Sequence, residues 1–412
     1  MKGRWIMPEI SGFEFEYVMN PDVGGDTPEA FSAAKARQVH RFHRDIPGYT
    51  ETPLAGLISL SSAWGVGGVF VKDESRRFGL NAFKALGGSY AVARLLCEKL
   101  DWDIAKTGFN RLRDPEVFAK IGRITLTTAT DGNHGRGIAW AAATLGQQAV
   151  IFMPKNPAPA RVEAIRAHGA RVEVTDLNYD DAVRLACQTA EREGWEVVQD
   201  TAWEGYTKVP TWIMQGYLTM VHEAVERLDA YGIRPTHVFL QAGVGAMAGA
   251  VAGYLADRFG ERAPTIVVVE PTNAACLYES MAAGDGKPHA VTGELKTIMA
   301  GLACGEPNPI GWDVLKATAQ CFVRCGDFVA ADGIRILANP IVGDPAVEAG
   351  ESGSVGVGLL HLLANLPAFA DLKGELGLTS RSVVLCFNTE GATDPVNYRD
   401  IAWFGKYPSK II

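Results

Sequence analysis

The chain has 412 residues, of which 47% are hydrophobic and 21% charged, and its net charge is −8 at pH 7. This length fits one large protein of two domains, and the composition is typical of a soluble globular protein. The acidic balance argues against a nucleic-acid partner, and no apolar run is long enough to predict a membrane span. Residues 1–5 lack the apolar core of a signal peptide, so we expect a cytoplasmic location.

In the first half of the chain, a regular alternation of predicted strands and helices begins near residue 124. Residues 1–60 carry turn signals and are expected to be irregular. A strand is expected over 68–72 and a helix over 85–100, with Lys84 in the loop between them. Beyond this point we expect regular alternation, with strands at 124–128, 149–153, 171–175 and 196–198 and helices at 135–145, 159–168 and 179–193. Such alternation predicts parallel βαβ units.

The second half repeats the alternation on a larger scale. A long helix after Pro210 to Tyr231 is followed by strands at 237–241 and 265–270, helices at 246–258 and 273–283, and a last strand at 382–387. The predicted fold is therefore α/β, with two open, mostly parallel twisted sheets flanked by helices. We expect a small α/β domain (96–210) to be inserted into a larger cofactor-binding domain (1–95 and 211–412).

The seven cysteines are scattered through the chain. Cys321 and Cys325 form a C-x3-C pair, but the nearest histidines, His289 and His361, lie too far along the chain to complete a recognisable metal motif. Reduced, buried thiols are therefore expected, and no metal site is predicted.

Lys84 stands in the segment N-A-F-K-A-L-G-G, residues 81–88, just before a predicted helix. Most lysines are solvated surface residues, but here apolar and small residues surround the amine. Gly87 and Gly88, one turn further on, permit close approach of a ligand to the start of the helix. Partial desolvation disfavours the charged form of an amine, which makes it a better nucleophile.

A glycine-rich turn follows the strand at 237–241 and leads into a helix. We expect it to present backbone N–H groups and a helix N-terminus to a phosphate, through Gly243, Val244, Gly245, Ala246 and Met247. An isolated lysine together with a phosphate cradle indicates pyridoxal phosphate held as a Schiff base.

An NAD-dependent oxidoreductase stays open as an alternative from another class. The glycine turn is an incomplete dinucleotide fingerprint, because Gly249 lies four residues after Gly245. However, Glu270 closes the next strand, where an acid that binds ribose would stand.

Polar residues follow two strands of the predicted smaller sheet. Asp131 and Asn133 lie between the strand at 124–128 and the next helix, and Asp200 follows the strand at 196–198. The carboxyl ends of parallel strands meet at one edge, where open α/β folds bind ligands. The alternative is structural, an Asx-turn with a helix cap for the first pair and an ordinary turn residue for Asp200.

Over about residues 60–400, these segments resemble the fold-type II pyridoxal-phosphate enzymes, the superfamily of tryptophan synthase β and threonine dehydratase. The resemblance implies that Lys84 carries the Schiff base, that Asn133 lies beside the phenolic oxygen of the cofactor, and that 243–245 bind its phosphate. It also implies that Thr389 meets the pyridine nitrogen. Glu351 is expected near the ring, although the family's E-P-S-G segment lacks its proline here.

Asp131 occupies the variable position of the family's S-x-G-N-H segment, where dehydratases usually have Ser or Ala. In Asp131, the Lys84 segment and Asp200, this chain most resembles the diaminopropionate ammonia-lyases. The resemblance implies α,β-elimination of 2,3-diaminopropionate to pyruvate and two molecules of ammonia. The alternatives on the same scaffold are a serine or threonine dehydratase and a β-replacement synthase. A small amino-acid substrate and a homodimer are also expected.

The catalytic residues are predicted to be Lys84, Asp131 and Asp200. A pair of carboxylates can bind and orient the cationic β-ammonium of a diamino acid. Carboxylates on the cofactor face opposite Lys84 could remove an α-proton that Lys84 does not reach. We expect Asp131 to be the base for the D-isomer and Lys84 for the L-isomer, while Asp200 binds an amino group of either.

Overall fold

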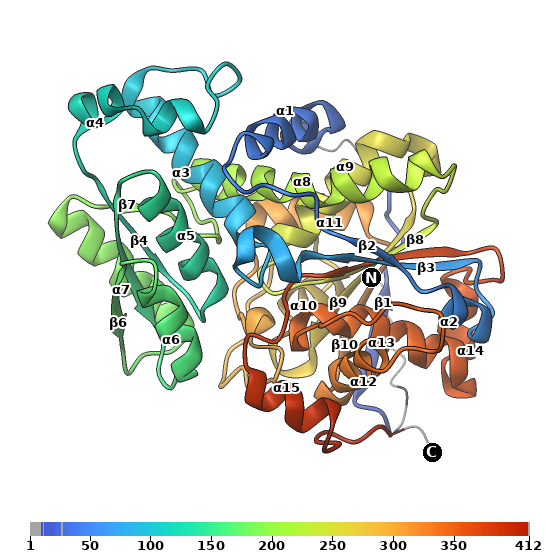
Figure 1. Ribbon diagram of the computed structural model, residues 1–412. Helices are drawn as coiled ribbons and strands as arrows, with labels where there is room; N and C mark the ends of the chain where they lie inside the picture. The colour runs from blue at the N-terminus through green and yellow to red at the C-terminus, as the bar shows by residue number, and fades with distance from the viewer. Residues whose placement is uncertain (1–9, 11, 26–27, 411–412) are drawn as a thin grey trace.

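The computed structural model describes residues 10, 12–25 and 28–410, which form two sheets flanked by helices (Figure 1). The larger sheet has seven strands in the order β1-β10-β9-β8-β11-β3-β2, and the smaller has four in the order β6-β5-β4-β7. The larger-sheet strands are β1 (Phe15–Met19), β2 (Leu54–Gly56), β3 (Gly68–Asp73), β8 (His237–Gln241), β9 (Thr265–Pro271), β10 (Cys321–Cys325) and β11 (Val383–Asn388). The smaller-sheet strands are β4 (Thr125–Ala129), β5 (Gln148–Met153), β6 (Arg171–Val174) and β7 (Glu196–Val197).

The strand directions confirm the predicted α/β fold. All pairs in the smaller sheet are parallel, and so are the pairs between the five inner strands of the larger sheet. The edge strands β1 and β2 are antiparallel to their neighbours. An antiparallel edge strand on an otherwise parallel sheet is common in α/β proteins.

Helices cover both faces of the larger sheet. The helices are α1 (Ala33–Arg44), α2 (Ile58–Ala63), α3 (Lys84–Leu100), α4 (Pro115–Ile121), α5 (Asn133–Thr144), α6 (Pro159–Arg166), α7 (Tyr179–Glu193), α8 (Lys208–Ala230), α9 (Ala246–Phe259), α10 (Cys276–Ala282), α11 (Pro309–Thr318), α12 (Asp327–Ala338), α13 (Glu351–Asn365), α14 (Ala370–Glu375) and α15 (Pro395–Ala402). Successive strand residues alternate between two apolar cores, with Leu240 and Val268 in one and Phe239 and Val267 in the other. The first core includes α3, α8 and α9, and the second includes α12 and α13.

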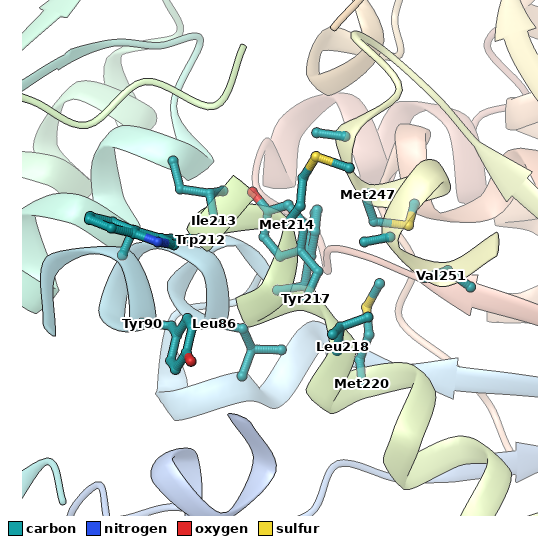
Figure 2. Packing of buried hydrophobic residues seen from close by; sticks show 14 of the residues in the cluster. Leu86, Tyr90, Trp212, Ile213, Met214, Tyr217, Leu218, Met220, Met247 and Val251 are labelled. Carbon is teal, nitrogen blue, oxygen red and sulfur yellow. The ribbon is translucent and has the colours of Figure 1, made fainter. Parts of the chain in front are cut away.

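Close packing of α3 against α8 fixes the start of α3. Figure 2 shows Leu86 of α3, Tyr217 of α8 and Met247 of α9 in one apolar cluster. A Cβ atom on Gly87 would lie 2.5 Å from the ring of Tyr217, and one on Gly88 would lie 3.1 Å from Ile138. The prediction that these glycines admit a ligand is therefore wrong, because they admit neighbouring helices instead.

The N-terminal part of the chain is more regular than predicted. Instead of an irregular segment over 1–60, the described residues include β1, α1, β2 and α2. The side chain of Ser32 caps α1, which buries Ala36, Val39 and Phe42 on one face. The prediction followed the turn residues between these short elements and did not take account of the helical spacing of apolar residues within α1. The N-terminal residues 1–5, on which the expected location depends, lie outside the described residues.

The boundaries of the two domains stay a prediction. All four strands of the smaller sheet lie within 96–210, whereas the seven strands of the larger sheet lie outside that range. In Figure 1 the smaller sheet, with α5, α6 and α7, lies to the left of the larger. The predicted boundaries fall inside α3 and α8.

Among the described residues, no single helix has the length and apolar character to cross a membrane. Helix α13 and the following segment Pro367–Glu375 are long and apolar enough only when taken together, and the chain bends by 100° between them.

Candidate active site

A cavity of about 940 Å³ opens where strands of both sheets end. Thr130 follows β4, Ala242 follows β8 and Thr389 follows β11, and all three line the cavity. This is the edge at which open parallel sheets bind ligands. The lining includes these predicted site residues: Lys84, Asp131, Asn133, Asp200, Gly243, Val244, Gly245, Ala246, Met247 and Thr389.

Glu351 is the exception among the predicted residues. It is buried at the first position of α13, where its carboxylate accepts a hydrogen bond from Asn397 Nδ2 at 2.5 Å. Among the described residues that line the cavity, its neighbour Ser352 is found and Glu351 is not. The expected position of Glu351 near the ring stays a prediction, since the first turn of α13 brings Ser352 to the cavity and leaves Glu351 behind it.

Lys84 is the first residue of α3, and not a loop residue as predicted. The preceding residue is anchored, because Phe83 N donates to Thr389 O at 3.0 Å. The Lys84 ammonium forms an ion pair with the Asp200 carboxylate. Burial lowers the pKa of Lys84, but Asp200 raises it by more, so the pKa lies above its ordinary value. Desolvation disfavours the charged amine, as predicted, but the ion pair with Asp200 outweighs it and the amine stays protonated.

Asp200 is buried among polar groups. Tyr179 OH donates to its Oδ1 at 3.3 Å, and His134 Nδ1 lies 3.8 Å from its Oδ2. Burial raises the pKa of this carboxyl, yet His134 and Lys84 lower it by more, so the pKa falls below its ordinary range. Asp200 therefore lies beside Lys84 in the wall of the cavity.

Asp131 is set apart from this pair and is more open. Its side chain is 31% exposed, and Arg161 Nη1 lies 3.8 Å from its Oδ2. Burial raises the pKa of Asp131, and the lowering effects of Arg161 and Lys84 do not fully offset it. The two predicted carboxylates thus share the cavity but have opposite pKa shifts. This is the usual sign of different roles at an active site.

Asn133 contacts a residue that the sequence analysis did not single out. Its Nδ2 donates to Glu390 Oε2 at 2.5 Å, and Ser352 N donates to Glu390 Oε1 at 3.3 Å. Glu390 is buried and lines the cavity. The amide of Asn133 is therefore oriented with its nitrogen toward a carboxylate, which leaves the second Nδ2 hydrogen available to an acceptor.

The turn from β8 to α9 forms a cradle of backbone donors. Gly245, with φ of +89°, stands before the first residue of α9, and no described side chain caps the N–H groups that follow it. A Cβ atom on Gly243 would lie 3.2 Å from Cys304 Sγ and from Gly301 O. An uncapped helix N-terminus that faces a cavity suits an anion such as phosphate.

Thr389 is held at the end of β11. Gln241 Nε2 donates to Thr389 Oγ1 at 3.0 Å and to Phe387 O at 2.7 Å. The hydroxyl accepts this bond, and no described group receives the hydrogen of Thr389 in return. A ring nitrogen in the cavity could accept it.

The contacts of Glu270 argue against the alternative of an NAD site. Its buried carboxylate accepts hydrogen bonds from Leu277 N at 2.9 Å and Tyr278 N at 2.7 Å, and so binds the start of α10. Burial raises its pKa to about 8. The described lining of the cavity does not include it, so the residue does not stand where a ribose would bind.

The cysteines are free, and five of the seven are buried as expected. Cys187 and Cys304 are half-buried, and Cys304 lines the cavity.

Comparison with known proteins identifies the family. The family model described as pyridoxal-phosphate dependent enzyme matches residues 46–366. The diaminopropionate ammonia-lyase of Escherichia coli (strain K12) is 52% identical over 399 residues, which cover 97% of this chain and 98% of the relative. This chain belongs to the diaminopropionate ammonia-lyase family.

Solved structures of the family agree with the fold. The Escherichia coli enzyme in complex with an aminoacrylate-PLP azomethine reaction intermediate matches with a TM-score of 0.89 and 50% identity, covering 96% of this chain and 99% of that one. Its complex with D-serine matches with a TM-score of 0.90 and 50% identity, covering 96% and 98%. The predicted family, the fold-type II architecture and pyridoxal phosphate as cofactor are confirmed.

The residues present fit this cofactor. The uncapped N–H groups at the start of α9 suit its phosphate, and the spare hydrogens of Asn133 and Thr389 suit its ring substituents. The hydroxyl of Ser352 is buried and has no hydrogen-bond partner among the described residues, although it lines the cavity. A buried polar atom of this kind is expected to acquire a partner when the cavity is filled.

Gly245→Val is expected to weaken cofactor affinity. A side chain there would be strained at φ of +89° and would contact Leu277 at 3.1 Å, which distorts the cradle. A bulky residue in this conformation costs about 1–3 kcal/mol. Titration of the apo-protein with pyridoxal phosphate measures the effect. Gly169→Val is the matched control, because Gly169 has φ of +78° and lies outside the described lining of the cavity. Unchanged affinity in folded Gly245→Val would contradict the assignment.

The sequence analysis missed several residues of this cavity. Glu390, Arg161 and Tyr179 all line it and contact predicted residues. Glu390 directly follows Thr389, so its place at the end of β11 was a usable signal. Arg161 and Tyr179 lie in the first turns of α6 and α7, which follow strands β5 and β6 of the smaller sheet. The carboxyl ends of these parallel strands lie at the same edge of the sheet as the cavity.

Proposed function

We propose that the protein catalyses α,β-elimination of 2,3-diaminopropionate to pyruvate and two molecules of ammonia. The observation that carries this proposal is the presence of Lys84, Asp131 and Asp200 in one cavity. An amine with two separate carboxylates suits a substrate that bears a second cationic amino group. The activity named for the relatives that are 52% identical supports the same substrate.

Pyridoxal phosphate, when bound, supplies an electron sink for negative charge at the α-carbon of the substrate. Lys84 would hold it covalently through Nζ, and the backbone of 243–247 would hold its phosphate. Asn133 would contact its phenolic oxygen and Thr389 its pyridine nitrogen. Since Gln241 fixes the hydroxyl of Thr389, that contact has a defined direction.

Two side chains are assigned proton steps, and a third binds the substrate. Asp131, through a carboxylate oxygen, removes the α-proton of the D-isomer, whereas Lys84 Nζ removes that of the L-isomer. Asp200 binds an ammonium group of either isomer, which its low pKa supports because it stays anionic at neutral pH. The side chains of Lys84 and Asp200 are largely buried, so their charges interact more strongly than they would in bulk water.

Two other reactions on this scaffold define the test. A serine or threonine dehydratase acts on a substrate whose β-hydroxyl group is neutral, which gives the carboxylates of Asp131 and Asp200 no second cation to bind. A β-replacement synthase would add a nucleophile and release one ammonia without pyruvate. The purified enzyme is expected to yield pyruvate and ammonia in a ratio of 1 to 2 from diaminopropionate, with much slower turnover of serine and threonine. Comparable turnover of serine would contradict the assigned substrate.

We also propose that the enzyme is a cytoplasmic homodimer. Seven free thiols suit a reducing compartment. Trp403 and Phe404 are 74% and 73% exposed, and association of two copies could cover such side chains. Light scattering should give twice the mass of the chain.

A further inference from the structure

Arg161 of α6 is a largely buried cation in the wall of the cavity. Its side chain is 13% exposed, and its Nη1 lies 3.8 Å from Asp131 Oδ2. Its Nη2 donates to Thr393 Oγ1 at 3.4 Å. Its Nε is buried and has no hydrogen-bond partner among the described residues. The described contacts of the guanidinium are thus one hydrogen bond to Thr393 and one ion pair within 4.0 Å, with Asp131.

The stem of Arg161 packs against the loop that carries Asp131. A Cβ atom on Gly132 would lie 3.0 Å from Arg161 Cδ and 3.3 Å from its Cγ. Gly132 has φ of +155°, a conformation that favours glycine. The position of the guanidinium and the path of this loop are therefore fixed together.

Several charged or titratable groups face Asp131. They come from α3, α6, α7, the ends of β7 and β11, and the segment before α11, and they are Lys84, Arg161, Tyr179, Asp200, Glu390 and Cys304. Of the two cations, Lys84 is paired with Asp200, whereas Asp131 is the described carboxylate within 4.0 Å of Arg161. Glu390, Glu351 and Asp394 lie further away and also raise the pKa of Arg161. The nearby carboxylates of Glu390 and Asp200 oppose a negative charge on Asp131, as burial does. Arg161 is thus the cation that lies closest to Asp131 in the ion pairs of the described residues and can balance its charge.

We infer that Arg161 is a positioning residue for the D-isomer reaction, which holds the Asp131 carboxylate in its ionised form and in place. This inference rests on the proposed function, in which Asp131 is the base for that isomer alone. The L-isomer reaction, which uses Lys84 as its base, does not depend on the protonation of Asp131.

Arg161→Gln tests this assignment through the pH dependence of kcat/KM for both isomers. Loss of an opposite charge at this distance raises a carboxyl pKa by about 1–3 units. The acid limb of the D-isomer profile is expected to move up by that amount, and each unit lowers the rate about tenfold at a fixed pH on the limb. The L-isomer profile is expected to stay in place. Arg161→Lys, which keeps the charge, should restore most of the D-isomer profile.

The alternative is that Arg161 binds the carboxylate common to both isomers. In that case Arg161→Gln would raise KM equally for D and L without moving either acid limb, and the inference would be overturned. Thr393→Val is a milder second variant, because it removes the anchor of Nη2 and keeps the charge. It is expected to shift the D-isomer limb in the same direction by less, and thermal melting checks that each variant is folded.

A direct titration separates this inference from the proposed function. The holoenzyme is labelled with [4-¹³C]aspartate, and the Asp131 carboxyl resonance is assigned by its loss in Asp131→Asn. A higher pKa for Asp131 in Arg161→Gln is expected, and it supports the inference that Arg161 keeps this carboxyl ionised. An unchanged pKa overturns it. If the pKa rises while the two isomers respond equally, the role of Asp131 as the D-isomer base fails, and the electrostatic role of Arg161 stands.

Discussion

Lys84→Ala is expected to abolish turnover of both isomers of diaminopropionate, with losses of at least about 10²–10⁴-fold. The variant removes the amine that we propose holds the cofactor covalently, and it also removes the base proposed for the L-isomer. It should lose the visible absorption band of the holoenzyme that borohydride bleaches. Asp200 would then lack its cationic partner, so a lower melting temperature is also expected.

Two other lysines provide matched controls for Lys84. Lys155 and Lys296 also line the cavity, and either could in principle carry the cofactor. Lys155→Ala and Lys296→Ala are expected to keep the reducible band. After borohydride reduction and proteolysis of the wild type, the label should lie on the peptide that contains Lys84. A reducible adduct on either of the other two lysines in Lys84→Ala would show that the assignment is wrong.

The parts of the site that could be predicted are local in sequence. The segment around Lys84 and the glycine turn after β8 each combine a recognisable composition with a strand-to-helix change. Parallel topology then brings such turns to one edge, which is why Asp131 and Asp200 were expected in the same cavity. The alternating strands and helices were predicted for the same reason, because buried parallel strands are short apolar runs.

The features that could not be predicted concern relations between distant residues. The charge state of Lys84 depends on Asp200, which lies 116 positions away and contacts it directly. The role of Gly87 depends on Tyr217 from another helix. Short-range patterns carry no information on such contacts.

Asp131→Asn should separate the two isomers. Asparagine keeps the shape of the side chain but does not remove a proton, so kcat/KM for the D-isomer should fall by about 10²–10⁴-fold. The L-isomer should lose little, because Lys84 remains. Asp200→Asn is the matched comparison, and it should impair both isomers since Asp200 is proposed to bind an ammonium group of either.

The two carboxylates differ in burial and in the direction of their pKa shifts. Asp200 is buried beside Lys84, and its pKa is lowered, whereas Asp131 is 31% exposed, contacts Arg161 and has a raised pKa. If Asp131 only shaped the cavity, its replacement by the isosteric amide would affect both isomers alike. Equal losses for D and L in Asp131→Asn would therefore refute its role as a base for one isomer. A selective loss of the D-isomer, with Asp200→Asn impairing both, requires that the two carboxylates act on different atoms of the substrate.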